Sequence, residues 1–265
     1  MMVLGVIEIE EVSKSYPNAT GPAVERLSLT IGSKSLHVLL GESGSGKTTV
    51  LKMINRLIEP TAGRILLDGE DIHTLDPISL RRRIGYAFQG VGLFPHMTVG
   101  ENIAVVPRLL GWSPADVGAR VAELLESVNL SPGAFRDRFP RELSGGQQQR
   151  VGVARALAAR SRVLLMDEPF GALDPITRDE LQRELKRLQQ SLGLTVVLVT
   201  HDVNEALLLA DRIAVMKDGC LLAHDTPARL LQNPPHDYVR ELMEMPRRQA
   251  SLLSGLAASA EAARA

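Results

Sequence analysis

Residues 41–48 read Gly41-Glu42-Ser43-Gly44-Ser45-Gly46-Lys47-Thr48 and fit the pattern G-x-x-x-x-G-K-[ST]. An apolar run at 36–40 precedes them, and apolar residues at helical spacing follow over 48–57, so the stretch lies between a strand and a helix. Glycines let backbone N–H groups converge on phosphate oxygens, toward which the new helix directs its positive end. We therefore expect Lys47 to contact the β- and γ-phosphates of a nucleotide and the Thr48 hydroxyl to ligate Mg²⁺.

Other apolar runs predict the sheet around this loop. Strand signals fill 7–31 around a turn, and short apolar runs occur at 163–166 and 195–199. Buried strands separated by helices indicate an α/β fold with a mostly parallel sheet covered on both faces. The stretch from about 90 to 143 lacks strand-like runs and contains the helix start Ser113-Pro114, so we expect a helical insertion there. We also expect two short helices over 227–244, broken at Pro234-Pro235, and a frayed or disordered tail at 248–265.

Two acids end the second of these apolar runs. The run Val163-Leu164-Leu165-Met166 leads directly to Asp167 and Glu168, at the carboxyl edge of the sheet, where ligands bind in folds of this kind. Asp167 would hold the shell of the Mg²⁺ ion, and Glu168 would act on an attacking water as a general base. Two acids that merely cap a strand before a turn are the alternative, and the phosphate loop in the same chain argues against it.

A second anion-binding pattern follows the helical insertion. Leu143-Ser144-Gly145-Gly146-Gln147 opens a helix-like run over 148–159, and a serine with two glycines at a helix start makes an anion cradle. Two cradles far apart in one chain need an explanation. With the phosphate loop, this pentapeptide and the acid pair in this order, the sequence resembles the ATP-binding cassette family, the nucleotide-binding subunits of ABC transporters. In that family the pentapeptide is the signature motif, which binds the γ-phosphate of ATP held by the opposite subunit.

The resemblance implies roles for four further residues. Tyr16 matches the aromatic residue that stacks on adenine, and Gln89 matches the glutamine loop that reaches the Mg²⁺ site. Asp174 matches the loop that crosses the dimer interface, and His201 matches the switch histidine that touches the γ-phosphate. The implied catalytic residues are Glu168, His201, Gln89 and Lys47, and the implied metal ligands are Thr48, Gln89 and Asp167. The implied nucleotide contacts are Tyr16, Gly41, Glu42, Ser43, Gly44, Ser45, Gly46, Lys47, Thr48, Thr49, Ser144, Gly145, Gly146, Gln147 and Asp174.

The same resemblance implies the fold and the assembly. It implies a P-loop NTPase (RecA-like) α/β core with an antiparallel β subdomain and an inserted α-helical subdomain, forming one ATPase domain over 1–247. The cofactors would be ATP and Mg²⁺. Because Ser144 would complete the site of a second chain, two copies should meet head to tail around a two-fold axis as a homodimer. The further partners would be integral-membrane permease subunits and, indirectly, a solute-binding protein, at the cytoplasmic face of the cell inner membrane.

Four stretches also resemble the branch of importers for osmoprotectants such as glycine betaine, carnitine and choline. They are KMINRL at 52–57, RRRIGY at 81–86, GLFPHMTV at 92–99 and DPITR at 174–178. An importer of methionine or of an inorganic anion is the alternative. Many members of this branch carry a pair of regulatory CBS domains after the cassette, for which the tail after 247 is too short. By family position, 89–100 would form the groove for a cytoplasmic helix of the permease.

Composition bounds the remaining alternatives. The 265 residues include 30 basic and 31 acidic side chains, which weighs against the DNA-acting ATPases that share these motifs and usually add basic surfaces, zinc modules or coiled coils. One cysteine excludes an internal disulfide and a Cys-rich zinc site. No apolar run approaches the roughly 18 residues that span a bilayer, so a detached ATPase subunit is expected. The chain has a single signature motif, which argues against a translation-associated ATPase with two cassettes. A P-loop kinase is a further alternative, but it would leave the anion-binding pattern at 143–147 unexplained.

Overall fold

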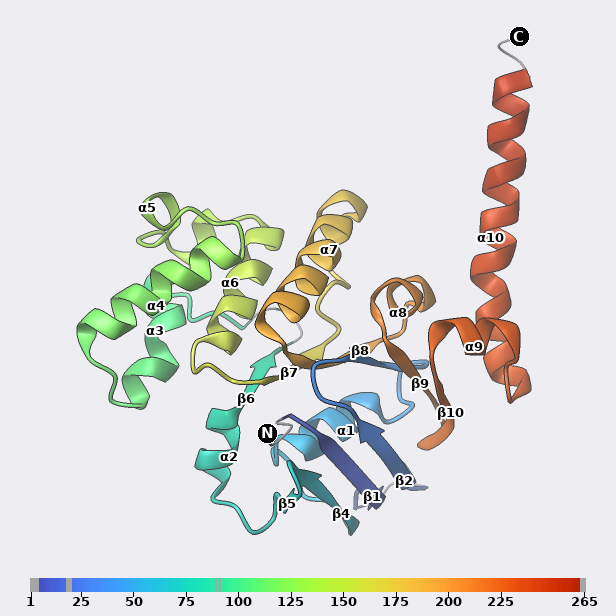
Figure 1. Cartoon of the computed structure of the whole chain (residues 1–265), viewed down its shortest axis with the longest axis horizontal. Coiled ribbons are helices and arrows are strands. Elements are labelled where there is room, and N and C mark those ends of the chain that lie inside the picture. The colour runs from blue at the N-terminus through green and yellow to red at the C-terminus, as the bar shows by residue number, and fades with distance from the viewer. Residues whose placement is uncertain (1–4, 18–20, 89, 91, 263–265) are drawn as a thin grey trace.

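A six-stranded sheet with the order β10-β9-β3-β8-β7-β6 forms the centre of the computed structural model, which describes residues 5–17, 21–88, 90 and 92–262 (Figure 1). The strands are β3 (Leu36–Leu40), β6 (Ile84–Ala87), β7 (Val163–Asp167), β8 (Thr195–Thr200), β9 (Arg212–Lys217) and β10 (Cys220–Asp225). The first five run parallel, and β10 pairs antiparallel with β9 at the edge. The mostly parallel sheet expected from the apolar runs is confirmed.

Both faces of this sheet are covered, which explains why its central strands are uninterrupted apolar runs. Every residue of β3, β7 and β8 is buried. Leu36 and Val38 pack into one apolar cluster, together with α7 (Pro175–Leu192) and α8 (Val203–Leu209), whereas Leu39 packs into a second cluster with α1 (Lys47–Ile54). The helix expected over 48–57 ends early, at Ile54, because Arg56 adopts a left-handed backbone with φ of 47°.

A smaller antiparallel sheet lies on the α1 side. It has the order β2-β1-β4-β5. Its strands are β1 (Ile7–Lys14), β2 (Val24–Ile31), β4 (Ala62–Leu67) and β5 (Glu70–Asp71), and α2 (Pro77–Arg83) leads from it to β6. Ile9 stands opposite Leu29 on one side and Ile65 on the other, and all three are buried against α1 in the second cluster. This sheet is the antiparallel β subdomain that the sequence led us to expect.

The stretch between β6 and β7 consists of helices joined by loops, with no strand among its described residues. It contains α3 (Val99–Leu109), α4 (Pro114–Ser127), α5 (Pro132–Phe135), the 3₁₀ turn η1 (Pro140–Glu142) and α6 (Gly145–Leu157). Thr98 begins α3 through a reciprocal capping box with Glu101, and Ser113 caps α4 as expected. Figure 1 shows these helices gathered to one side of the large sheet.

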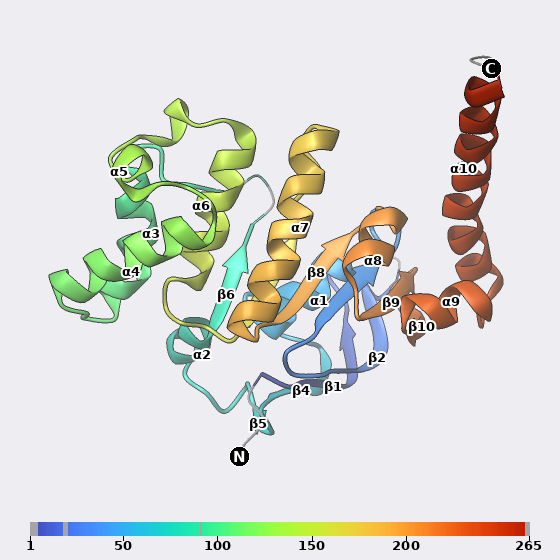
Figure 2. The ribbon, with the colours of Figure 1, turned by 45° about the horizontal axis from the view of Figure 1, so that its top comes forward.

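The C-terminal part differs from the expectation in one respect. Thr226 caps α9 (Pro227–Gln232), and α10 begins after the Pro234-Pro235 break. However, α10 (Asp237–Ala262) is 26 residues long rather than short, and it continues into the tail at 248–265. It extends away from the sheet in both views (Figures 1 and 2). Among the residues described, no helix is long and apolar enough to cross a membrane.

Candidate functional site

The loop at 41–48 joins the buried end of β3 to the first turn of α1. Gly46 has φ of 98°, and a Cβ there would overlap the carbonyl oxygen of Ala23, so only glycine fits. Lys47 is buried to 4% exposure, and its Nζ donates to the carbonyl oxygens of Gly41 at 2.8 Å and Glu42 at 2.6 Å. Burial lowers the pKa of Lys47, and the nearby carboxylates oppose that shift. The loop therefore holds a desolvated cation at the N-terminus of a helix, as an anion site requires.

Thr48 and Asp167 come together from distant parts of the chain. Thr48 stands in the first turn of α1 and Asp167 ends β7. The Thr48 hydroxyl donates to Asp167 Oδ1 at 2.9 Å. Asp167 is only 6% exposed, and burial raises its pKa despite this hydrogen bond. A buried carboxylate beside a hydroxyl is an oxygen donor set that suits Mg²⁺, whose charge would compensate the desolvation. The two residues therefore fit the metal role that the sequence predicts.

Glu168 and His201 form the second pair at this sheet edge. His201 Nδ1 lies 3.3 Å from Glu168 Oε1, and their side chains are 60% and 23% exposed, respectively. The Glu168 backbone N–H donates to Val199 O at 3.0 Å, which ties the residue to β8. Its φ of 44° is a left-handed conformation, which costs a non-glycine residue about 1–2 kcal/mol. A carboxylate held in this way beside an imidazole can accept a proton from a water molecule and orient it.

The signature pentapeptide lies beside the Asp174 loop. Ser144 caps α6, because its Oγ accepts from the Gln147 N–H at 3.3 Å while Gln147 Oε1 accepts from the Ser144 N–H at 3.0 Å. Asp174 caps α7 without a reciprocal bond, because its Oδ1 accepts from the N–H groups of Ile176 at 3.2 Å and Thr177 at 3.1 Å. The space around Gly145 and Gly146 is bounded by Leu173 and Thr177. The two helix N-termini are therefore neighbours.

Two predicted residues, Tyr16 and Gln89, have no described contact with the other site residues. Tyr16 is 41% exposed, and the Lys14 ammonium lies 5.3 Å from its ring centroid, so its ring is accessible for stacking. Gln89 lies outside the residues that the structure describes. The structure thus brings the 41–48 loop together with Asp167 at one position and the signature together with Asp174 at another.

Sequence reasoning missed a residue that connects two of these loops. Arg178 Nη2 donates to Leu173 O at 3.1 Å, and its Nη1 lies 3.6 Å from Asp202 Oδ2, so it joins the Asp174 loop to the residue after His201. The spacing of four residues from Asp174 to Arg178 places both on one face of α7. That spacing could have marked Arg178, but its partner across the fold could not be read from the sequence.

A glycine-rich loop with a buried lysine, a Thr–Asp pair whose oxygens suit a divalent cation and a separate helix-capping signature are together typical of a P-loop nucleotide-binding cassette. The sequence pattern of the family described as ABC transporter matches residues 24–171. The chain is 53% identical to the carnitine transport ATP-binding protein OpuCA of Listeria monocytogenes over 238 residues, covering 90% of this chain and 59% of that protein. It is 51% identical to the glycine betaine uptake system ATP-binding protein YehX of Escherichia coli, covering 89% and 76%.

The chain therefore belongs to the ABC transporter family, and it spans about three fifths of the length of its OpuCA relative. A solved structure with the same fold is the dimeric post-hydrolysis state of the ATP-binding cassette MJ0796 bound to ADP and Pi. It has a TM-score of 0.74 at 35% identity and covers 83% of this chain and 98% of that one. The cassette fold that the sequence predicts is confirmed.

Proposed function

We propose that this chain is the ATP-hydrolysing subunit of an ABC importer and that it works as a head-to-tail homodimer. The observation that carries the proposal is the meeting of Thr48 with Asp167 and of Glu168 with His201 beside the 41–48 loop, at 2.9 Å and 3.3 Å. The similarity to the MJ0796 dimer bound to ADP and Pi supports it. The second cradle at Ser144 has no use within one chain, and a two-fold assembly would give it one.

Five side chains of this chain would have separate roles in ATP hydrolysis. Lys47 would exchange its bonds to the loop carbonyls for bonds to the β- and γ-phosphates. Thr48 and Asp167 would hold Mg²⁺, which supplies charge neutralisation to the phosphates when bound. Glu168 would accept a proton from the attacking water. His201 would contact the γ-phosphate and help to align it with that water.

Turnover and dimerisation of a Glu168→Gln variant test this assignment. We expect ATP binding to be retained, ATPase turnover to fall by roughly 100-fold or more because a general base is lost, and ATP-bound dimers to accumulate on gel filtration. Glu241→Gln, which changes an exposed acid on α10, is the matched control and should behave as wild type. Rapid hydrolysis by the Glu168→Gln variant would refute the assignment of the base.

An apolar groove supports a permease partner. It has a volume of about 280 Å³ and is bounded by residues of α2, α3, α6 and β6. Phe88 and Phe94 line it and are 48% and 40% exposed, so two large aromatic side chains are accessible in one groove, as an interaction site requires. We propose that a cytoplasmic helix of the permease occupies this groove, which would hold the subunit at the inner face of the membrane.

The solute is proposed to be a quaternary-amine osmoprotectant. Two relatives are named as ATP-binding proteins for carnitine transport and for glycine betaine uptake, which supports this proposal. The four stretches that resemble the osmoprotectant importers support it as well. An importer of another small solute is the second candidate. Uptake of labelled glycine betaine by cells that express this chain together with a permease and a solute-binding protein tests the choice. Uptake of a different solute alone would refute it, and DNA-dependent ATPase activity without a membrane partner would refute transport altogether.

A further inference from the structure

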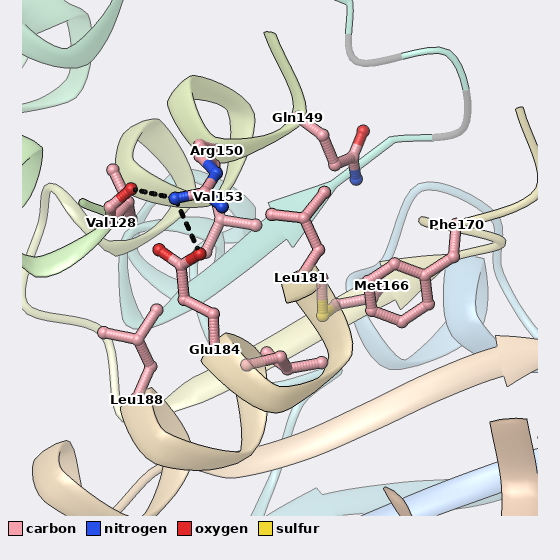
Figure 3. Close-up of a pocket in the computed structure, with 10 residues that line it drawn as sticks. Val128, Gln149, Arg150, Val153, Met166, Phe170, Leu181, Glu184 and Leu188 are labelled. Atoms are coloured by element: carbon pink, nitrogen blue, oxygen red, sulfur yellow. Dashed lines mark hydrogen bonds and ion pairs between the residues drawn. The ribbon is translucent and has the colours of Figure 1, made fainter. Parts of the chain in front are cut away.

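The packing of α6 on α7 is apolar and incompletely filled (Figure 3). Their contact leaves a partly open hollow of about 20 Å³, which is room for about one water molecule. Its apolar wall consists of Val153, Met166, Phe170, Leu181, Leu185 and Leu188. Apolar contact is non-directional, so this surface alone would tolerate more than one position of α6 along α7.

One buried ion pair crosses this surface. Arg150 Nη1 lies 2.9 Å from Glu184 Oε2 and donates to the carbonyl oxygen of Val128 at 3.1 Å, as Figure 3 shows. The side chains of Arg150 and Glu184 are 15% and 6% exposed. Burial raises the pKa of Glu184, and the charge of Arg150 is the largest influence that opposes this. The same guanidinium lies 3.8 Å from the Glu180 carboxylate, one turn earlier on α7, so it connects α6 and the C-terminus of α4 with two acids of α7.

The two helices joined in this way carry the groups of the second cradle. Arg150 stands six residues beyond Ser144, about 9 Å along α6, and Glu184 stands ten residues beyond Asp174, about 15 Å along α7. Close to their N-termini the helices touch at Gly146, where a Cβ would overlap Thr177 Cγ2. A shift of α6 at the ion pair would therefore move Ser144 relative to Asp174. Met166, next to Asp167, lines the same hollow.

We propose that Arg150 and Glu184 are positioning residues for ATP hydrolysis, because their ion pair sets where α6 lies on α7 and hence where Ser144 stands. This inference rests on the proposed function, in which Ser144 contacts ATP held by the partner subunit. Stability alone does not account for the pair. Replacing a buried ion pair by apolar side chains of similar volume is often neutral or stabilising, whereas the charged pair adds a directional contact to the steric contact at Gly146 and Thr177.

The double variant Arg150→Met/Glu184→Leu separates position from stability. We expect its Tm to equal or exceed that of wild type. We expect the ATP affinity of the monomeric double variant to stay within two-fold of the wild-type monomer. We expect kcat to fall at least ten-fold, and, with Glu168→Gln added, the ATP concentration that produces dimers to rise at least five-fold. The exposed pair Arg240 and Asp237 on α10, 2.6 Å apart, changed to Met and Leu, is the control and should leave all four quantities unchanged.

The outcomes distinguish this inference from the proposed function. A folded double variant with wild-type kcat would overturn the positioning role, and so would a fall in kcat matched by a fall in Tm of more than 10 °C. Glu184→Gln, which keeps the shape of the side chain, should lower kcat about three-fold or more without changing the KM for ATP; an effect on KM alone would also overturn the role. Absence of ATPase activity in wild type itself would instead refute the proposed function.

Discussion

His37 makes the folded protein sensitive to mild acid. It lies in the buried strand β3, is 2% exposed, and its Nδ1 lies 3.4 Å from Nε2 of His224 on β10. Burial, assisted by the charges of His224 and Arg212 and opposed by Asp211, lowers the pKa of His37 to about 4. An unfolded chain would protonate the same imidazole near 6.5. Between these values, the unfolded state binds the proton and the folded state does not, so acid favours unfolding.

The size of the effect follows from the two pKa values. The interval from 6.5 to about 4 corresponds to roughly 3 kcal/mol of folding free energy at 1.36 kcal/mol per pKa unit. The stabilisation from the neutral His37 is fully present above pH 6.5 and is lost progressively as the pH falls from 6.5 to about 4. Below a pH of about 4, no further stability is lost through His37. Between pH 7 and pH 4.5, the share lost through His37 is about 2 kcal/mol.

Urea unfolding at pH 7 and pH 4.5 measures this share. His37→Gln keeps a polar side chain of similar size without a group that titrates in the range. Carboxylates contribute alike to both proteins, so wild type should lose about 2 kcal/mol more than the variant between the two pH values. His224→Gln removes the neighbouring ring but keeps His37, so its loss of unfolding free energy between the two pH values should differ from that of wild type by less than the loss of His37→Gln does. Equal losses in wild type and His37→Gln, or an imidazole NMR titration of His37 near 6.5, would refute the reasoning.

Two further predictions concern the metal pair and the groove. Thr48→Val removes the hydroxyl that bonds Asp167 at 2.9 Å, so nucleotide affinity should fall about ten-fold, or about 1.4 kcal/mol, in Mg²⁺ and little without it; equal losses with and without Mg²⁺ in a fluorescent-nucleotide titration would contradict the metal role. Phe94→Asp places a charge in the 280 Å³ groove, so co-purification with the permease should be lost while ATP binding is retained, and intact assembly would show that the groove lies elsewhere.

The sequence could predict the parts of the site that depend on local spacing. The loop before Lys47, the strand that ends at Asp167 and the helix that begins at Ser144 each follow from a few consecutive residues, and the structure has all three in the expected elements. The role of Asp174 as the cap of α7 was not predicted. The early end of α1 was missed, because a left-handed residue such as Arg56 has no signal in apolar spacing. The length of α10 was missed for a related reason, since alanine-rich composition favours helix and also suits a flexible tail.

Contacts between distant elements could not be predicted from one sequence. The apolar spacing of α6 and α7 predicts that they are buried, but their relative position depends on which side chains meet across the contact. Arg150 and Glu184 carry opposite charges 34 residues apart, as do many other pairs in the chain, and nothing local marks them as partners. The same holds for Arg178, whose bond to Leu173 O is local while its contact with Asp202 is not.

The electrostatics of the site also explain why composition carried so little information about anion binding. The chain has a net charge of −1, yet α1, α6 and α7 each begin at one of the predicted nucleotide-binding motifs. The N-terminus of a helix carries about half a positive charge on its free N–H groups. Backbone dipoles, with Lys47 and a metal ion, can therefore compensate a triphosphate without an excess of basic side chains. A near-neutral chain and the proposed anion-binding site are compatible for this reason, and a search for basic patches alone would not find a site of this kind.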